Sequence, residues 1–161
     1  MQERIERLRT AFSDVNIDGL LVTGATNRRY MTGFTGSAGM ALITADEALF
    51  LTDFRYVEQA KEQAPDYTLV RYDDPYKTLH ERLARYSGRR IGFESQHGTV
   101  EQLESLKNPR DAQRADVEWV PVKGLVEGLR GIKSEEELEL IQTAVDIADR
   151  AFTHILDHLR P

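Results

Sequence analysis

The sequence of 161 residues contains no cysteine. This absence excludes a disulfide framework and every metal site built on thiolate ligands. The sequence also lacks a run of roughly 20 apolar residues, which is the length that a membrane-spanning helix requires. Its opening residues, MQERIERLRTAF, lack the apolar segment of a secretion signal. We therefore expect a cytoplasmic protein with no membrane partner.

An excess of basic charge is also missing. The chain carries 21 lysine and arginine residues against 27 aspartate and glutamate residues, which gives a formal net charge of -6. Because a phosphate backbone would be repelled by this charge, we expect no nucleic-acid partner. The length suits one domain that buries roughly 70% of its extended surface, together with a small appendage.

Short apolar runs that alternate with helical patterns indicate an α/β fold. They predict six strands, at residues 20–23, 40–44, 48–52, 68–72, 90–94 and 117–122. Pro121 favours a sheet edge or a strand end for the last of them, because proline cannot donate a ladder hydrogen bond. Helical spacing predicts helices at 2–14, 54–64 and 99–106, a helix beginning at Pro75, and a single helical turn at 26–31. Together these elements predict a three-layer mixed β-sheet.

The segment 27–60 holds most of the polar and aromatic candidates for a site. Its two apolar strands are joined by a tight polar turn at residues 45–47, which predicts a central β-hairpin. The flanks carry Asn27, Arg28, Arg29, Tyr30 and Ser37 before the hairpin, and Asp53, Arg55 and Tyr56 after it. We expect a hairpin inside the sheet to present both flanks at one rim.

The glycine-rich loop GFTGSAG, at residues 33–39, has two functional interpretations. As a phosphate-binding loop it lacks the Gly-Lys-Ser/Thr ending. As a nucleophile elbow around Ser37 it fails, because Thr35 stands where the motif requires glycine. We expect the glycines to let the chain turn sharply beside the hairpin. Asp73 and Asp74 are interpreted as a solvated turn.

A long amphipathic helix is predicted at residues 135–159. Ser134 and Glu137 form a capping-box pattern at its start. Its apolar positions recur every three or four residues, and the helix would be roughly 37 Å long. Because a domain of this size cannot cover such a helix, we expect it to pack on a second partner. His154 and His158 lie at the i, i+4 spacing of a metal pair, but they lack a neighbouring third ligand, which favours a helix-terminal role.

Two motifs resemble one known family. The first is NRRYMTGFTGS, followed by LFLTDFRYVEQA, and the second is LRGIKSEEELELI with ADRAF. In this order they resemble the amino-terminal domain of the creatinase/prolidase/aminopeptidase P family. The resemblance implies a ribonuclease-H-like sheet in domain 1–131 and a linker helix in residues 132–161. We expect the chain to be a fragment whose missing catalytic domain continues beyond Pro161.

The resemblance also implies a function for the parent protein. It would be a metal-dependent Xaa-Pro peptidase, either an aminopeptidase P or a prolidase, that hydrolyses the bond before proline. Two aspartates, a histidine and two glutamates of the missing domain would hold two divalent ions, expected to be manganese. The expected partners are proline-containing peptides and a second copy in a homodimer. Two alternatives remain open: a protein- or peptide-binding relative that has lost its metal ligands, and a creatinase-like amidinohydrolase.

The resemblance implies that the catalytic and metal-ligating residues all belong to the missing domain and that none lies in this chain. We expect the domain to shape the substrate cleft, with Arg55 or Tyr56 facing the substrate, because a guanidinium suits a peptide carboxylate through two parallel hydrogen bonds. Asn27 and Tyr30 are further candidates for the same rim. Asp53 is a candidate at the rim that would also cap the following helix, and a purely structural pair of Arg55 with an acid is the competing interpretation.

Overall fold

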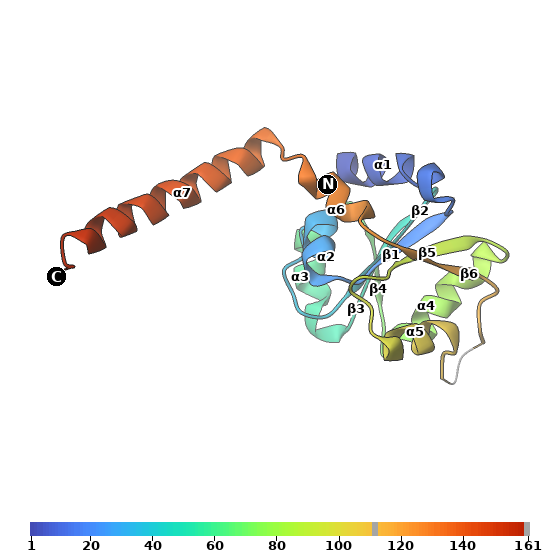
Figure 1. Ribbon diagram of the computed structural model, residues 1–161. Coiled ribbons are helices and arrows are strands. Elements are labelled where there is room, and N and C mark those ends of the chain that lie inside the picture. Colours follow the sequence, from blue (N-terminus) through green and yellow to red (C-terminus); the bar gives the residue numbers. More distant parts are fainter. Residues whose placement is uncertain (111–112, 160–161) are drawn as a thin grey trace. The chain divides into compact units, whose positions relative to one another are not determined.

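The computed structural model describes residues 1–110 and 113–159 and contains a six-stranded mixed β-sheet (Figure 1). The strands are β1 (Gly19–Val22), β2 (Met40–Thr44), β3 (Ala48–Thr52), β4 (Thr68–Arg71), β5 (Arg90–Glu94) and β6 (Glu118–Val122). Their order across the sheet is β4-β3-β2-β1-β5-β6, so the β2–β3 hairpin lies inside the sheet. The predicted mixed sheet with a central hairpin is confirmed.

Strand direction gathers the ends of five strands at one edge. β2 is antiparallel to β1 and to β3, whereas β3 with β4, β1 with β5 and β5 with β6 are parallel pairs. The carboxyl ends of all strands except β2 therefore meet at a single edge of the sheet. The start of β2 lies at that same edge, and so does the loop before it.

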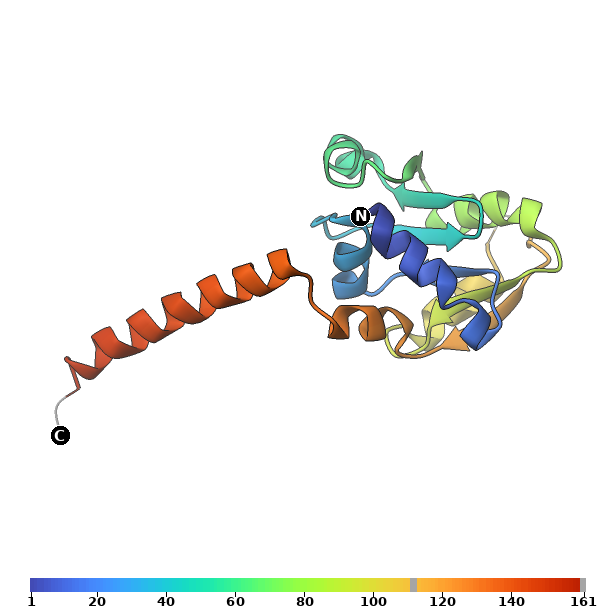
Figure 2. The same cartoon turned by 90° about the horizontal axis from the view of Figure 1, so that it is seen from above.

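Helices cover both faces of the sheet (Figure 2). The helices are α1 (Gln2–Thr10), α2 (Ala25–Thr32), α3 (Val57–Gln63), α4 (Pro75–Leu83), α5 (Val100–Lys107), α6 (Leu125–Gly131) and α7 (Glu135–Leu156). Short 3-10 turns lie at η1 (Ser13–Val15), η2 (Phe54–Tyr56) and η3 (Ala84–Tyr86). Buried side chains of α1, α2, α3 and α6 belong to one core cluster, and those of α4 and α5 belong to a second.

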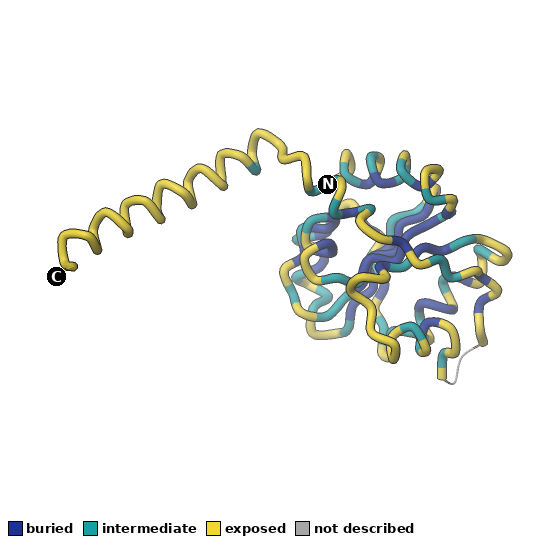
Figure 3. Tube along the Cα trace, viewed as in Figure 1, coloured by how far each residue is buried: buried dark blue, intermediate teal, exposed yellow. Residues whose placement is uncertain are grey.

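The two core clusters follow from the alternation of side chains along each strand. In β2, Ala41 and Ile43 join the cluster under α1 and α2, whereas Met40 and Leu42 join the cluster under α4 and α5. All five residues of β2 are buried, as Figure 3 shows for the centre of the sheet. The sequences of β1, β2 and β3 are therefore nearly continuous apolar runs, which is typical of a sheet covered on both faces.

The chain divides into two compact units, Met1–Leu129 and a second unit that begins at Arg130. The second unit contains α7, whose N-cap residue is Ser134. The Ser134 hydroxyl accepts a hydrogen bond from Glu137 N at 3.3 Å, and Glu137 Oε2 accepts one from Ser134 N at 2.9 Å. The predicted capping box is confirmed. None of the described helices combines the length and the apolarity that crossing a bilayer demands.

Two helix predictions need correction, and one helix was missed. The helix predicted at 2–14 ends at Thr10 and gives way to a 3-10 turn, after which Asn16 adopts a left-handed conformation with φ 52°. The single turn predicted at 26–31 is an eight-residue helix, α2. Helix α6 was not predicted, because Gly128 and Gly131 weaken its helical pattern. It forms where Val126 is buried in the core cluster.

The remaining boundaries shift by a few residues. The helix predicted at 54–64 begins as the 3-10 turn η2 and continues as α3. Pro121 lies in the edge strand β6, as predicted. The terminal helix predicted to reach residue 159 ends at Leu156, and the last two positions of the predicted linker, 160–161, lie outside the described residues.

Candidate functional site

The corner after β3 forms at the sheet edge where the carboxyl ends of the parallel strands meet. Asp53 is the N-cap residue of η2, and its Oδ1 accepts a hydrogen bond from Arg55 N at 2.9 Å. The predicted capping role of Asp53 is confirmed. This cap turns the chain from strand to helix, and it leaves Arg55 exposed while Tyr56 packs against the core cluster that contains Phe34.

Arg55 forms a bidentate pair with Asp53. Arg55 Nε lies 3.0 Å from Asp53 Oδ1, and Arg55 Nη2 lies 2.7 Å from Asp53 Oδ2. The side-chain hydrogen bond from Arg55 lowers the pKa of Asp53, and the same bond raises the pKa of Arg55. A guanidinium has five donors, and within the described part of the chain both Nη1 donors lack a hydrogen-bond acceptor. Because 58% of the Arg55 side chain is exposed, these donors can bind an incoming carboxylate.

Tyr56 connects this corner to the glycine-rich loop. Its hydroxyl lies 2.7 Å from Ser37 Oγ, and its ring meets the Phe34 ring edge-on at a centroid distance of 5.6 Å. The Arg55 guanidinium carbon lies 5.3 Å from the centre of the Tyr56 ring. Asp53, Arg55, Tyr56 and Ser37 therefore form one exposed polar cluster, which we call the rim cluster.

A buried arginine fixes the loop that carries Ser37. Arg28 is only 6% exposed, and it donates from Nη1 to Gly39 O at 2.8 Å and from Nη2 to Gly36 O at 2.7 Å. Burial lowers the pKa of Arg28. Its Nε is buried without a hydrogen-bond partner among the described residues. Arg28 therefore acts as an internal clamp on the glycine-rich loop rather than as a surface group.

Two predicted rim residues lie elsewhere. Asn27 is 1% exposed, and its Nδ2 donates to Glu94 Oε1 at 2.7 Å and to Glu127 Oε1 at 2.6 Å. The Tyr30 hydroxyl donates to Leu129 O at 3.3 Å, and its ring packs under the Arg4 guanidinium at 4.1 Å. The structure therefore does not bring Asn27 and Tyr30 into the rim cluster.

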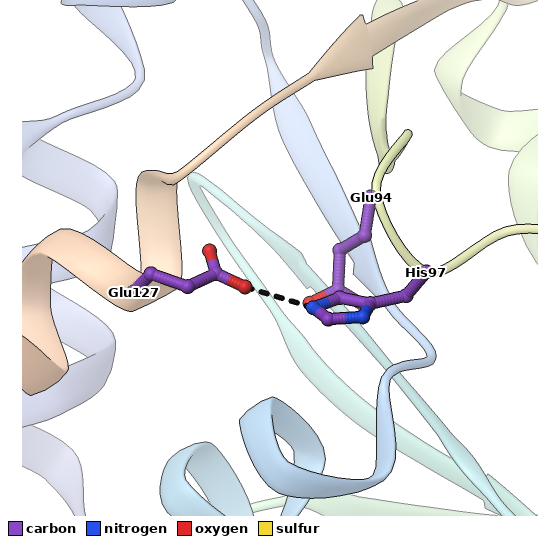
Figure 4. Close-up of side chains that lie close together, drawn as sticks. All are labelled: Glu94, His97 and Glu127. Carbon is purple, nitrogen blue, oxygen red and sulfur yellow. Dashed lines mark hydrogen bonds and ion pairs between the residues drawn. The ribbon is translucent and has the colours of Figure 1, made fainter.

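Sequence reasoning missed a second polar cluster, formed by Glu94, His97 and Glu127 (Figure 4). Its members come from the end of β5, the following loop and α6, so no local spacing in the sequence signals it. His97 Nε2 lies 2.9 Å from Glu127 Oε1. Burial alone would raise the pKa of Glu127, but hydrogen bonds from Asn27 and His97 outweigh this effect and lower it.

A cavity of about 330 Å³ lies between these two clusters in the fold. β1 and β5 are adjacent parallel strands, and the helices that follow them, α2 and α5, contribute to opposite core clusters. Crevices of this kind, outside the carboxyl ends of strands where the chain diverges, are the usual ligand sites of open α/β sheets. Thr23, Arg28, Ser37 and Gln102 supply polar groups to a lining that also includes Leu103.

The described residues do not fit the dinuclear metal centre that the resemblance implies. That centre needs two aspartates, a histidine and two glutamates, whereas the described residues hold a single candidate group, which consists of Glu94, His97 and Glu127. His154 and His158 have rings 4.6 Å apart, and His158 Nδ1 lies 2.9 Å from His154 O. Within the described chain this histidine pair belongs to no group of three candidate ligands.

The six-stranded sheet and its rim define the class of domain. Residues 4–132 match the Creatinase/Prolidase N-terminal domain family, so the chain belongs to this family. A match over most of the chain is stronger support than the two motifs alone.

Individual relatives are similar over the whole chain. The Uncharacterized peptidase YqhT of Bacillus subtilis is 43% identical over 98% of this chain and 44% of the relative. A solved Xaa-Pro dipeptidase from Bacillus anthracis is 42% identical, with a TM-score of 0.90, over 99% of this chain and 44% of that chain. The chain thus spans less than half the length of these relatives.

A third relative is a separate domain. The solved N-terminal domain of cytoplasmic peptidase PepQ from Mycobacterium tuberculosis H37Rv is 33% identical, with a TM-score of 0.71. The similarity covers 80% of this chain and 98% of that chain. A domain of this type therefore forms the observed sheet without the rest of its polypeptide.

Proposed function

We propose that this chain is the accessory amino-terminal domain of a metal-dependent Xaa-Pro peptidase, an aminopeptidase P or a dipeptidase of the prolidase type. The observation that carries the proposal is the similarity to the Xaa-Pro dipeptidase from Bacillus anthracis, which extends over 99% of this chain but only 44% of that enzyme. The rest of the enzyme has no counterpart in this sequence. A cytoplasmic location is part of the proposal and is supported by the similarity to the cytoplasmic peptidase PepQ.

In this proposal the domain contributes no catalytic group. Hydrolysis before proline acts on an imide nitrogen that carries no hydrogen, and it requires an activated water. Among the described residues, the rim cluster offers Ser37 with the Tyr56 hydroxyl as its neighbour rather than a histidine base. The two divalent ions, expected to be manganese, belong to the proposed catalytic domain. This chain would form one side of the substrate cleft, so that only short peptides enter. It would also contact a second copy in a homodimer.

Arg55 is the residue we propose for direct substrate contact. Asp53 holds one edge of the guanidinium, which leaves the Nη1 end directed toward solvent. A short substrate ends in a carboxylate close to proline, and an arginine recognises such a group through parallel charge-assisted hydrogen bonds. Because Asp53 already fixes the side chain, binding would cost less rotamer entropy than it would for a free arginine.

The test is a domain exchange. The amino-terminal part of the Bacillus anthracis Xaa-Pro dipeptidase is replaced by this chain, and hydrolysis of Ala-Pro and Leu-Pro is measured. We expect the fusion to be active and Arg55→Ala to raise its KM by about tenfold, which corresponds to about 1.4 kcal/mol of binding energy. The unchanged dipeptidase is the positive control.

A matched control comes from the same chain. Arg89 pairs with Asp18 at 3.1 Å, and 62% of its side chain is exposed, so it resembles Arg55 in exposure and in pairing but lies at the opposite edge of the sheet. Arg89→Ala should leave the KM of the fusion unchanged. Equal kinetic parameters for the Arg55→Ala and Arg89→Ala fusions would contradict the proposed role of Arg55.

A further inference from the structure

We propose that Glu94, His97 and Glu127 form a binding site for a single divalent transition-metal ion. The proposal concerns residues of this chain alone and does not depend on the proposed peptidase function. Each residue offers one ligand atom, and these atoms lie within 4.8 Å of one another. Figure 4 shows the Glu127 side chain reaching from α6 toward the His97 ring, with the Glu94 side chain beside it.

The distances suit one ion. Metal–ligand bonds of about 2.1 Å place the ligand atoms of a tetrahedral site about 3.4 Å apart. His97 Nε2 and Glu127 Oε1 are 2.9 Å apart, and the third ligand atom lies within 4.8 Å of both. Small side-chain rotations therefore convert the observed cluster into a coordination shell. His97 Nε2 would then bind the metal instead of forming a hydrogen bond with Glu127.

Neighbouring groups already fix two of the three ligands. Glu94 Oε2 accepts hydrogen bonds from Thr23 N at 2.6 Å and from Gly24 N at 2.7 Å, which leaves Oε1 directed at the cluster. The His97 ring packs directly on Gly24, where an added Cβ would lie 2.9 Å from His97 Cδ2. Such contacts orient metal ligands and strengthen binding.

Asn27 marks the position that a cation would take. Its Nδ2 lies between the two carboxylates, 2.7 Å from Glu94 Oε1 and 2.6 Å from Glu127 Oε1. A donor that bridges two carboxylates occupies the place of positive charge between them. Rotation of this amide by half a turn would present Oδ1 instead, which is an oxygen ligand suited to a divalent ion.

The chemistry of the donors indicates the class of ion. One imidazole with two carboxylates suits zinc, manganese or cobalt, whereas calcium and magnesium prefer oxygen ligands alone. A cavity of about 10 Å³ is lined by Glu94, His97 and Glu127 together with apolar residues that include Leu20 and Val122. A cavity of this size is near the minimum that holds one water molecule, so the site has room for an ion or an ion-bound water but for nothing larger.

The bound ion would connect three segments that are distant in sequence. Glu94 ends β5, His97 lies in the loop before α5, and Glu127 lies in the first turn of α6. A metal that binds only the folded arrangement stabilises it by mass action. The proposed role is therefore to hold α6 against the β5–α5 loop.

Isothermal titration calorimetry of the 161-residue chain with Zn²⁺ tests the site. The measurement is made in the His154→Ala/His158→Ala variant, so that the exposed histidine pair on α7 contributes no heat. We expect one equivalent of Zn²⁺ to bind, and we expect His97→Ala in the same background to weaken binding by more than about tenfold. Glu127→Gln should weaken it similarly, whereas Glu118→Gln, which changes an exposed carboxylate on β6, should not.

Mn²⁺ supplies an independent readout of position. In NMR spectra of the isotopically labelled chain, substoichiometric Mn²⁺ should broaden the backbone amide signals of Gly24 and Gly98 before those of β3 and β4. His97→Ala should abolish this selectivity, while the other signals in the spectrum keep the positions that they have in the folded chain. No binding of either ion, or binding that His97→Ala leaves unchanged, would overturn the proposal and identify the cluster as a metal-free hydrogen-bond network.

Discussion

At the scale of single residues, the Glu94 carboxylate connects β5 with the chain segment that leads into α2. It accepts from Thr23 N, Gly24 N and Asn27 Nδ2, and Glu94 is only 7% exposed. The two backbone donors lie in the turn between β1 and α2, so Glu94 fixes the position at which the chain enters this helix. The N-cap residue of α2 is Gly24, whose position offers no side-chain acceptor.

Removing this carboxylate should therefore destabilise the fold. We expect Glu94→Ala to lower the free energy of unfolding by about 3 kcal/mol, because buried donors without partners cost about 1–3 kcal/mol each. Urea denaturation in the presence of EDTA measures the change without any contribution from bound metal. Glu104→Ala, on the exposed face of α5, is the control and should change stability by less than about 0.5 kcal/mol. Equal stability of the two variants would show that the hydrogen bonds from Thr23 and Gly24 to Glu94 do not stabilise the fold.

His80 gives a prediction for the pH dependence of stability. It is 1% exposed, its Nε2 lies 2.9 Å from Leu106 O, and its Nδ1 accepts from Ala115 N at 3.0 Å. Burial lowers the pKa of His80 and outweighs the opposite effect of the Leu106 carbonyl. The unfolded chain therefore binds a proton more readily than the folded one. The stability that neutral His80 provides is complete above about pH 6.5 and decreases as the pH falls below that value.

We expect the free energy of unfolding of the unmodified chain to fall between pH 7.5 and pH 5.5. His80→Gln should lower stability at pH 7.5 and should show a smaller decrease over this interval, because glutamine does not titrate. His154→Ala, which alters an exposed histidine, should keep the original pH dependence. Urea denaturation at several pH values measures all three proteins. Parallel curves for the unmodified chain and His80→Gln would contradict the assignment.

The residues differ in how far the sequence could predict them. Asp53 accepts a hydrogen bond from the backbone amide of Arg55, which lies two residues further along the chain. A local sequence pattern was therefore sufficient to predict its capping role. The placement of Asn27 depends on Glu94 and Glu127, which lie 67 and 100 residues away in sequence. No local pattern contains that information. The sequence therefore indicated the rim cluster but not the cluster around His97.

At the scale of elements, the turn after α2 positions the glycine-rich loop. Gly33 is the C-cap residue of α2 with φ 79°, a left-handed conformation, and a Cβ added there would lie 2.8 Å from Gln63 O. Gly88 has nearly the same φ, 75°, but a Cβ added at Gly88 would meet no atom within 4 Å. Comparing an alanine substitution at each position therefore distinguishes the cost of backbone strain, which both share, from the cost of a steric clash, which only Gly33 has.

Gly88→Ala should lower the free energy of unfolding by about 1 kcal/mol, from backbone strain alone. Gly33→Ala should lower it by about 3 kcal/mol, because the contact with Gln63 forces a backbone shift in addition to the strain. Chemical denaturation of both variants tests this difference. If Gly33→Ala proved no more destabilising than Gly88→Ala, α2 would not end in the packed turn that the structure shows.

Elements were predictable from the sequence where their causes are local. The hairpin, the edge position of Pro121 and the capping boxes of α5 and α7 each follow from a few adjacent residues. Helix α2 was predicted too short, because the turn before it is fixed by Glu94, which lies on the distant strand β5. Helix α6 was missed, because burial of Val126 rather than helical propensity stabilises it.

At the scale of the molecule, the family relationship and the architecture both support the proposal that this chain is the amino-terminal part of a longer enzyme. The sheet of residues 1–129 is a Creatinase/Prolidase N-terminal domain, and the described residues offer no counterpart to a dinuclear peptidase centre. Helix α7 carries exposed apolar side chains, which include Leu140, Ile147 and Phe152. We propose that α7 is a linker helix of a longer enzyme, in which the rim cluster would form part of the cleft wall.

The most direct test of this account is a peptidase assay of the chain by itself. The purified 161-residue chain is incubated with Ala-Pro and Leu-Pro in the presence of added Mn²⁺, alongside the Bacillus anthracis Xaa-Pro dipeptidase as the positive control, and released proline is measured. Because the proposed catalytic domain supplies the metal centre, we expect no release above the enzyme-free blank. A manganese-dependent peptidase activity that copurifies with the chain and is abolished by EDTA would contradict this expectation.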